Sequence, residues 1–173
     1  MSKNKRVKKT TTKNTMKKTT KSFYEQLNPN RPYEEQMDII APHLSKFVSE
    51  FGEYMVNELE FIKIQTIANY LPLRNHYISV EMLSNDTLYN QLSESKKLDW
   101  KNNFLTDEQI SEHDKKITFL FRDTCHEWLV SQKKLLKILK LSYSNPNDYQ
   151  HLFDCFAKMI WDFNQFENPI VSK

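Results

Sequence analysis

A single glycine, Gly52, occurs in the 173 residues of this chain, where average usage would supply about twelve. Glycine is the residue that most readily adopts a positive φ or lets a ligand approach the backbone. A chain with one glycine cannot contain a dinucleotide-binding G-x-G-x-x-G, a Walker A loop or a G-x-S-x-G nucleophile elbow. It is also poor in the tight hairpin turns that β-sheets need. The sequence therefore predicts an all-α protein.

The charge of the chain is divided between two parts. Residues 1–22 contain eight Lys, Arg6 and no acidic residue, which gives a charge of +9. The remaining residues contain 16 basic and 22 acidic side chains, which gives −6. A low-complexity basic tail on an acidic body is typical of a segment that contacts a polyanion. The alternatives are that the tail folds back onto its own body, improves solubility, or serves as a targeting segment.

The tail suits diffuse contact with phosphates. Lysines displace condensed counterions there, which gives a salt-sensitive affinity without sequence preference, and no aromatic residue precedes Phe23 to stack on bases. The residues expected to contact nucleic acid are Lys3, Lys5, Arg6, Lys8, Lys9, Lys13, Lys17, Lys18 and Lys21. We expect residues 1–28 to form a disordered Lys/Thr-rich tail and junction, and residues 29–173 to form a single helical domain.

Apolar residues at helical spacing predict a bundle of about four main helices. The longest, about 107–142, begins with the capping box Thr106-Asp-Glu-Gln109. At about 54 Å it is longer than a compact bundle needs. One end of it is therefore expected either to project from the bundle or to pair with another subunit, which makes a second copy of the chain one candidate partner. Phe121 and Phe156 are expected in the core, at the centres of their apolar stripes. A helix is expected to start at 33–41, and Pro42 either kinks it or opens a next helix that continues from 43 to about 71. The remaining expected helices are 76–83, 86–94 capped by Ser84 or Asn85, and a last one from Asn147 or Asp148 to about 166.

Carboxylates and histidines recur at a spacing found in helical di-metal sites. Asp123–His126 and Asp148–His151 are each three residues apart, and His151 precedes Cys155 by one helical turn. Metal ligands would have to point inward, however. On their helices Asp123 and His126 lie beside the apolar stripe, and His151 lies roughly opposite it. We therefore expect ordinary surface residues here, with no metal and no cofactor.

The two cysteines, Cys125 and Cys155, fall inside predicted helices on or near the apolar face. Neither lies at a helix N-terminus, where a thiolate would be stabilised. The sequence shows no secretory signal and no apolar run long enough for a membrane span. We expect reduced core thiols in an intracellular protein, cytoplasmic or, in a eukaryotic host, nuclear. A disulfide between the two is the alternative, and no catalytic residue is expected.

Two segments are candidates for contact with a partner. Residues 133–141, KKLLKILKL, resemble a helix that binds a membrane surface or another protein. The favoured interpretation is an ordinary helix end, with leucines facing the core and lysines facing water. Trp161 falls beside the apolar face of the last helix. We expect it to be partly exposed and to anchor a protein interface.

The sequence thus favours a non-enzymatic helical binding or adaptor protein. Its body would contact another protein, and its tail would contact nucleic acid or another polyanion. The first alternative is a protein-directed module, such as a phage, viral or plasmid-type inhibitor or assembly component, with an incidental tail. The second is a helical metal protein or enzyme that uses Asp123, His126, His151 and Cys155.

Overall fold

The computed structural model describes residues 22–163, and the regular structure within that range is entirely helical. Two 3-10 turns, η1 (Tyr24–Gln26) and η2 (Tyr33–Gln36), come first. Seven α-helices follow: α1 (Met37–Asn69), α2 (Leu71–Ser84), α3 (Asp86–Gln91), α4 (Glu94–Lys101), α5 (Asp107–Ser131), α6 (Lys133–Ser142) and α7 (Pro146–Asp162). The all-α prediction is confirmed for the described residues.

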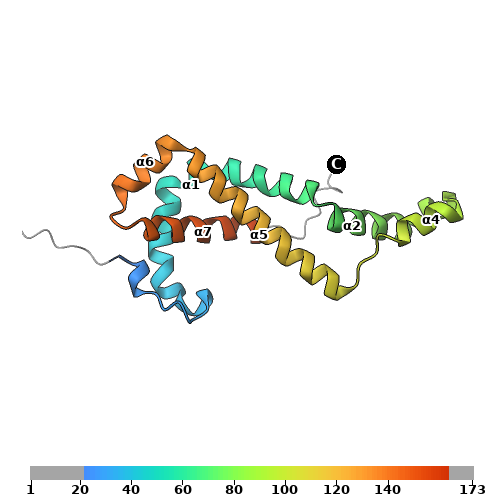
Figure 1. Cartoon of the computed structure of the whole chain (residues 1–173), viewed down its shortest axis with the longest axis horizontal. Helices are drawn as coiled ribbons and strands as arrows, with labels where there is room; N and C mark the ends of the chain where they lie inside the picture. The colour runs from blue at the N-terminus through green and yellow to red at the C-terminus, as the bar shows by residue number, and fades with distance from the viewer. Residues whose placement is uncertain (1–21, 164–173) are drawn as a thin grey trace, which may run out of the picture.

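The longest helix is α1, which runs unbroken through Pro42. Proline removes one backbone hydrogen bond from a helix interior, but Pro42 lies near the exposed start of α1, where water can reach the freed carbonyl. Pro42 therefore does not open a second helix. Figure 1 shows that α1 is bent: its first half crosses one end of the molecule, and its second half follows the long axis.

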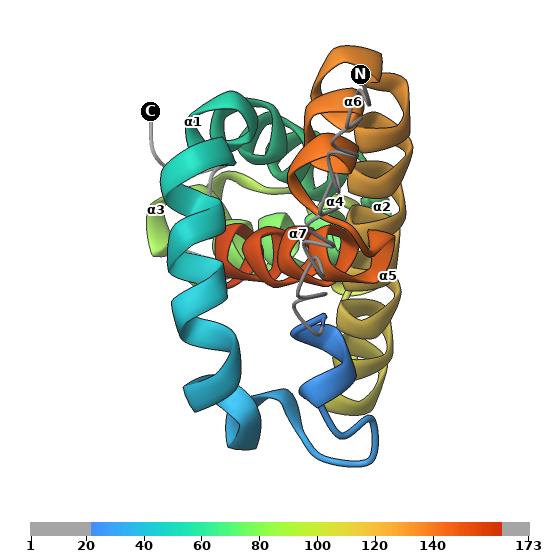
Figure 2. The ribbon, with the colours of Figure 1, turned by 90° about the vertical axis from the view of Figure 1, so that its left-hand side faces the viewer.

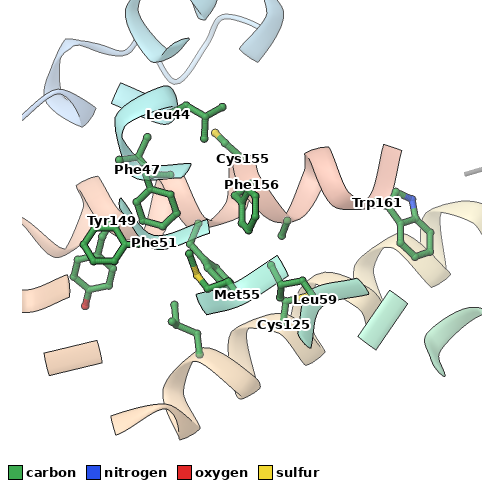
Figure 3. Packing of buried hydrophobic residues seen from close by; sticks show 14 of the residues in the cluster. Leu44, Phe47, Phe51, Met55, Leu59, Cys125, Tyr149, Cys155, Phe156 and Trp161 are labelled. Atoms are coloured by element: carbon green, nitrogen blue, oxygen red, sulfur yellow. The ribbon is translucent and has the colours of Figure 1, made fainter. Parts of the chain in front are cut away.

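The core lies where α1, α5 and α7 meet. Figure 3 shows Phe47, Phe51 and Met55 of α1 facing Phe156 of α7. Gly52 lies in this region, where a Cβ would come within 3.1 Å of Cγ1 of Val48 on the same helix and within an ordinary 3.8 Å of Cζ of Phe156. The tightest neighbour of the single glycine is therefore a side chain of its own helix. Phe121 and Phe156 are both buried, which confirms their predicted places in the core.

The single helix expected over 107–142 is divided in two at Gln132. Its ψ of 71° leaves the helical range, so α5 ends at Ser131 and α6 begins at Lys133. The N–H of Gln132 still bonds to the carbonyls of Trp128 and Leu129. Gln132 is neither glycine nor proline, so the sequence carries no break signal there. The change of direction, visible in Figure 1, brings Leu139 into the core, where it is fully buried.

Three short helices, α2, α3 and α4, form an arm at the opposite end of the molecule from α6 (Figure 1). Only Leu73, His76 and Ser79 are buried within these three helices. Nδ1 of His76 accepts a hydrogen bond of 3.1 Å from the N–H of Leu105, which ties the arm to the start of α5. The sequence predicted two short helices in this region and missed α4.

Local capping chemistry agrees with the sequence at two helix starts and differs at a third. Both hydrogen bonds of the Thr106–Gln109 capping box are present, and the Asn85 side chain caps α3. The start of α7 differs, because Asn145 is its N-cap and Pro146 its first residue. Proline is well suited to that first position, where its missing N–H costs nothing. Asp148 is thereby left free for another contact.

Candidate functional site

The nine bases assigned to the tail lie outside the described residues, but the point where the tail joins the body is described. The Ser22 hydroxyl donates a hydrogen bond to Oδ1 of Asp148. The N–H of Tyr24 donates to the same oxygen at 3.1 Å. Asp148 lies in the first turn of α7, where the helix dipole favours a carboxylate. The root of the tail is therefore held at the start of α7.

Phe23 fixes this root by burial in the core. Its ring stacks on His43, with centroids 4.6 Å apart, and lies 6.0 Å from the ring of His151. The following loop is also held, because the Gln36 side chain bonds to the N–H and carbonyl of Asn28 and to the carbonyl of Arg31. Residues 22–28, expected from sequence as part of the tail and junction, pack on the body.

A basic face lies at the same end of the molecule. Helix α6 carries Lys133, Lys134, Lys137 and Lys140 and no acidic residue, and all four lysines are exposed. None of them forms an ion pair among residues 22–163. Figure 2 looks onto this end, where α6, α7 and residues 22–36 face the viewer. We call these four lysines the α6 basic face.

Trp161 is a core residue, contrary to the expectation of partial exposure. Only 4% of it is exposed, and its ring centroid lies 4.8 Å from that of Phe121 on α5. The buried Lys63 passes 6.0 Å from this ring and donates to the carbonyls of Ile160 and Phe163, which caps the end of α7. Because α7 contacts both α1 and α5, it buries a wider face than one apolar stripe predicts.

The histidine and carboxylate pairs of the sequence do not form metal sites in the described structure. Nε2 of His126 lies 2.5 Å from Oδ1 of Asp154, a residue of α7, so His126 links two helices. The i, i+3 pattern pointed to Asp123 and could not reveal Asp154, because the contact joins residues 28 positions apart. Among residues 22–163, no group of three or more His, Cys, Asp or Glu is placed to hold a metal ion.

Both cysteines are free and buried. Burial raises the pKa of Cys125 to about 12 and that of Cys155 to about 11. Neutral thiols of this kind are poor nucleophiles, because the thiolate is the reactive form. The predicted core placement of both cysteines is confirmed.

A cleft of about 540 Å³ opens between η2, α5 and α7. Its walls include Tyr33, Arg122, His151, Asp154, Cys155 and Lys158. Burial lowers the pKa of His151, and its Nε2 has no hydrogen-bond partner in the structure. Nε2 of His151 therefore makes no hydrogen bond to Cys155, although both residues line the cleft. The cleft combines a neutral histidine, a protonated thiol and one lysine already paired with Asp162.

Comparison with known proteins assigns no function to this arrangement. No protein-family profile matches the chain, and no curated protein and no solved structure matches it significantly. Among the described helices, none combines the length and the apolar character required to cross a bilayer.

Proposed function

We propose that this chain is a non-enzymatic helical binding protein whose basic N-terminal tail contacts nucleic acid or another polyanion. The observation that carries the proposal is the separation of charge along the chain. Residues 1–21 hold nine bases and no acid, whereas residues 22–163 hold 15 bases and 21 acids. A tail of this charge attracts phosphates at long range, and the acidic body repels them.

The folded end of the molecule supports the proposal in two ways. Ser22 and Tyr24 are held on Asp148, so the tail starts from a defined point on the body. The α6 basic face lies at that same end, and its lysines have no acidic partner among the described residues. A phosphate backbone held by the tail would meet further positive charge there. The α6 basic face thus extends the proposed binding surface.

The non-enzymatic part of the proposal is supported by the state of the reactive side chains. Both thiols are held protonated by burial, and His126 is engaged by Asp154. An intracellular location, cytoplasmic or nuclear, belongs to the same proposal, because nucleic acid and a reducing environment are found there.

Fluorescence anisotropy with labelled oligonucleotides tests the proposal. The intact chain is expected to bind single- and double-stranded DNA and RNA without sequence preference. Affinity falls with salt by a logarithmic slope of about 0.7 to 0.9 for each phosphate contacted, so four contacts lose roughly three orders of magnitude over a tenfold rise in salt. Deletion of residues 1–21 should abolish binding. Absence of binding by the intact chain at low salt, or equal binding by the truncated chain, contradicts the proposal.

The contribution of α6 is tested by a matched pair of triple variants. Replacing Lys134, Lys137 and Lys140 by Gln should weaken binding and reduce the salt slope. Replacing Lys96, Lys97 and Lys101 of α4, at the other end of the molecule, removes the same charge and should have a smaller effect. Equal effects would show that only net charge matters and that α6 is not part of the surface.

A second candidate function, a protein-directed interaction module, is favoured by a separate observation. Tyr54, Phe61 and Ile64 of α1 are apolar and exposed, on the face that points away from the core. The two functions are compatible, because the first uses the tail and the second uses the body.

A further inference from the structure

The second half of α1 carries an apolar row on its outer face. Tyr54, Phe61 and Ile64 are 71%, 58% and 50% exposed. Together with Asn57 and Ala68 they alternate at spacings of three and four residues, which is the a/d pattern that a helix presents to a partner helix. We call Tyr54, Asn57, Phe61, Ile64 and Ala68 the α1 seam.

The α1 seam is distinct from the core face of the same helix. Met55, Leu59 and Ile62 are buried and pack toward α5 and α7. A single exposed apolar residue needs no explanation. A second periodic apolar face is different, because a helix that is apolar on two sides is normally covered on both. Within the described chain, only the inner face is covered.

The charges beside the α1 seam define what it can accept. Glu53, Glu58 and Glu60 occupy flanking positions of the heptad and are exposed. None of the three forms an ion pair among the described residues. Flanking charges select partners in helix pairs, because opposite charges attract across the seam and like charges repel. The partner should therefore be basic at its flanking positions.

Three occupants available from this chain fit less well. The α1 seam of a second copy would place its flanking glutamates against those of the first copy, and these like charges would repel each other. The tail has the required charge, but Met1, Val7 and Met16 are its only aliphatic side chains apart from threonines, and they do not follow a seam. The C-terminal segment 164–173 carries one acid and one lysine, so it has no positive excess.

We propose that the α1 seam is a docking site for an amphipathic helix of another protein, apolar along its a/d row and flanked by Lys or Arg. This inference rests on the second candidate function, the protein-directed module, and names its partner; it is separate from the polyanion contact of the tail. The α1 seam lies along the second half of α1, whereas the tail root lies at the end of the molecule beside α6 (Figure 1). Loss of nucleic-acid binding would leave the inference intact, and the reverse also holds.

The test uses the full chain and a fluorescent helical peptide with Leu at a/d positions and Lys at the flanking positions. The intact protein is expected to bind it and not to bind a scrambled peptide of the same composition. Phe61→Ser should lower the affinity at least about tenfold, as loss of a central aromatic anchor does. Phe119→Ser is the matched control, because Phe119 on α5 is 57% exposed and lies outside the α1 seam. That control variant should bind normally.

Charge reversal distinguishes specific docking at the α1 seam from nonspecific hydrophobic binding. A triple variant with Glu53→Lys, Glu58→Lys and Glu60→Lys should no longer bind the Lys-flanked peptide. It should instead bind a Glu-flanked peptide that has the same apolar row. Circular dichroism confirms that each variant keeps its helix content, so that loss of binding is not mistaken for unfolding.

Several results would overturn the inference. Absence of binding by the intact chain, or equal loss with Phe61→Ser and Phe119→Ser, would exclude a specific seam. A dimer by sedimentation that Phe61→Ser converts to a monomer would assign the seam to a second copy. Binding that appears only after deletion of residues 164–173 would assign it to the chain's own C-terminal segment.

Discussion

The environment of individual residues decides which side chains of this protein are reactive. Cys125 and Cys155 are removed from water, and burial raises the pKa of each thiol above its ordinary value of 9.0. His126 is held by Asp154, and His151 is kept neutral by burial. Residue types that suggest chemistry in the sequence therefore serve packing and helix contacts in the folded chain.

Both native thiols should resist modification at neutral pH. A thiol reagent is expected to react slowly with the folded protein and rapidly in denaturant, because the thiolate is scarce and the sulfurs are buried. A Ser111→Cys variant supplies an exposed thiol as the control. Folded-state pKa values above 9.0 also mean that the thiols' contribution to stability is complete below pH 9.0 and is lost as the pH rises toward 11 to 12. Rapid modification of the native protein would contradict the buried placement.

At the scale of elements, the division between α5 and α6 sets the shape of one end of the molecule. The turn at Gln132 directs Leu139 into the core and leaves Leu141 79% exposed. The same turn presents the α6 basic face at the end of the molecule that also carries the tail root (Figure 2). An unbroken helix over 107–142 would separate these features, since it would carry the lysines away along the axis of α5.

Two leucines on α6 test this turn. Leu139→Ala should lower the free energy of unfolding by about 2 to 5 kcal/mol, as expected for a large-to-small change in a packed core. Leu141→Ala is the control on the same helix, and its effect should stay within about 0.5 kcal/mol. Urea unfolding followed by circular dichroism measures both. A small effect at Leu139, or equal effects at both positions, would mean that α6 is not docked as described.

At the scale of the whole molecule, the body holds the root of a highly charged segment. The contact is made by Ser22, Phe23 and Tyr24, with Asp148 as the acceptor. Neighbouring residues therefore have separate roles. Residues 1–21 carry the positive charge, and residues 22–24 attach the segment to the body.

Two truncations separate these roles. Deletion of residues 1–21 should leave the melting temperature nearly unchanged, because the contacts of Phe23 remain. Deletion of residues 1–27 removes Phe23 from the core, and loss of a buried phenylalanine costs about 3 to 5 kcal/mol. The longer truncation should therefore melt at a clearly lower temperature in calorimetry. Equal melting of the two truncated chains would show that the Phe23 contact does not stabilise the body.

The sequence by itself determined the features that depend on neighbouring residues. The scarcity of glycine indicated a helical protein, and the Thr106–Gln109 box and the Asn85 cap marked helix starts, because capping acts within one turn. The separation of charge was equally visible, since charge is a sum over the chain. Phe121 and Phe156 were identified as core residues from the spacing of apolar positions alone.

Only the tertiary structure decided which surfaces meet. The burial of Trp161, the pairing of His126 with Asp154 and the attachment of Phe23 all depend on α7 packing between α1 and α5. The break at Gln132 has the same origin, because docking of Leu139 outweighs the local preference for a continuous helix. The α1 seam became visible only when the core had covered one apolar face of that helix and left the other exposed. Burial is a property of packed elements, and the spacing of residues along one helix does not specify how many neighbours that helix will have.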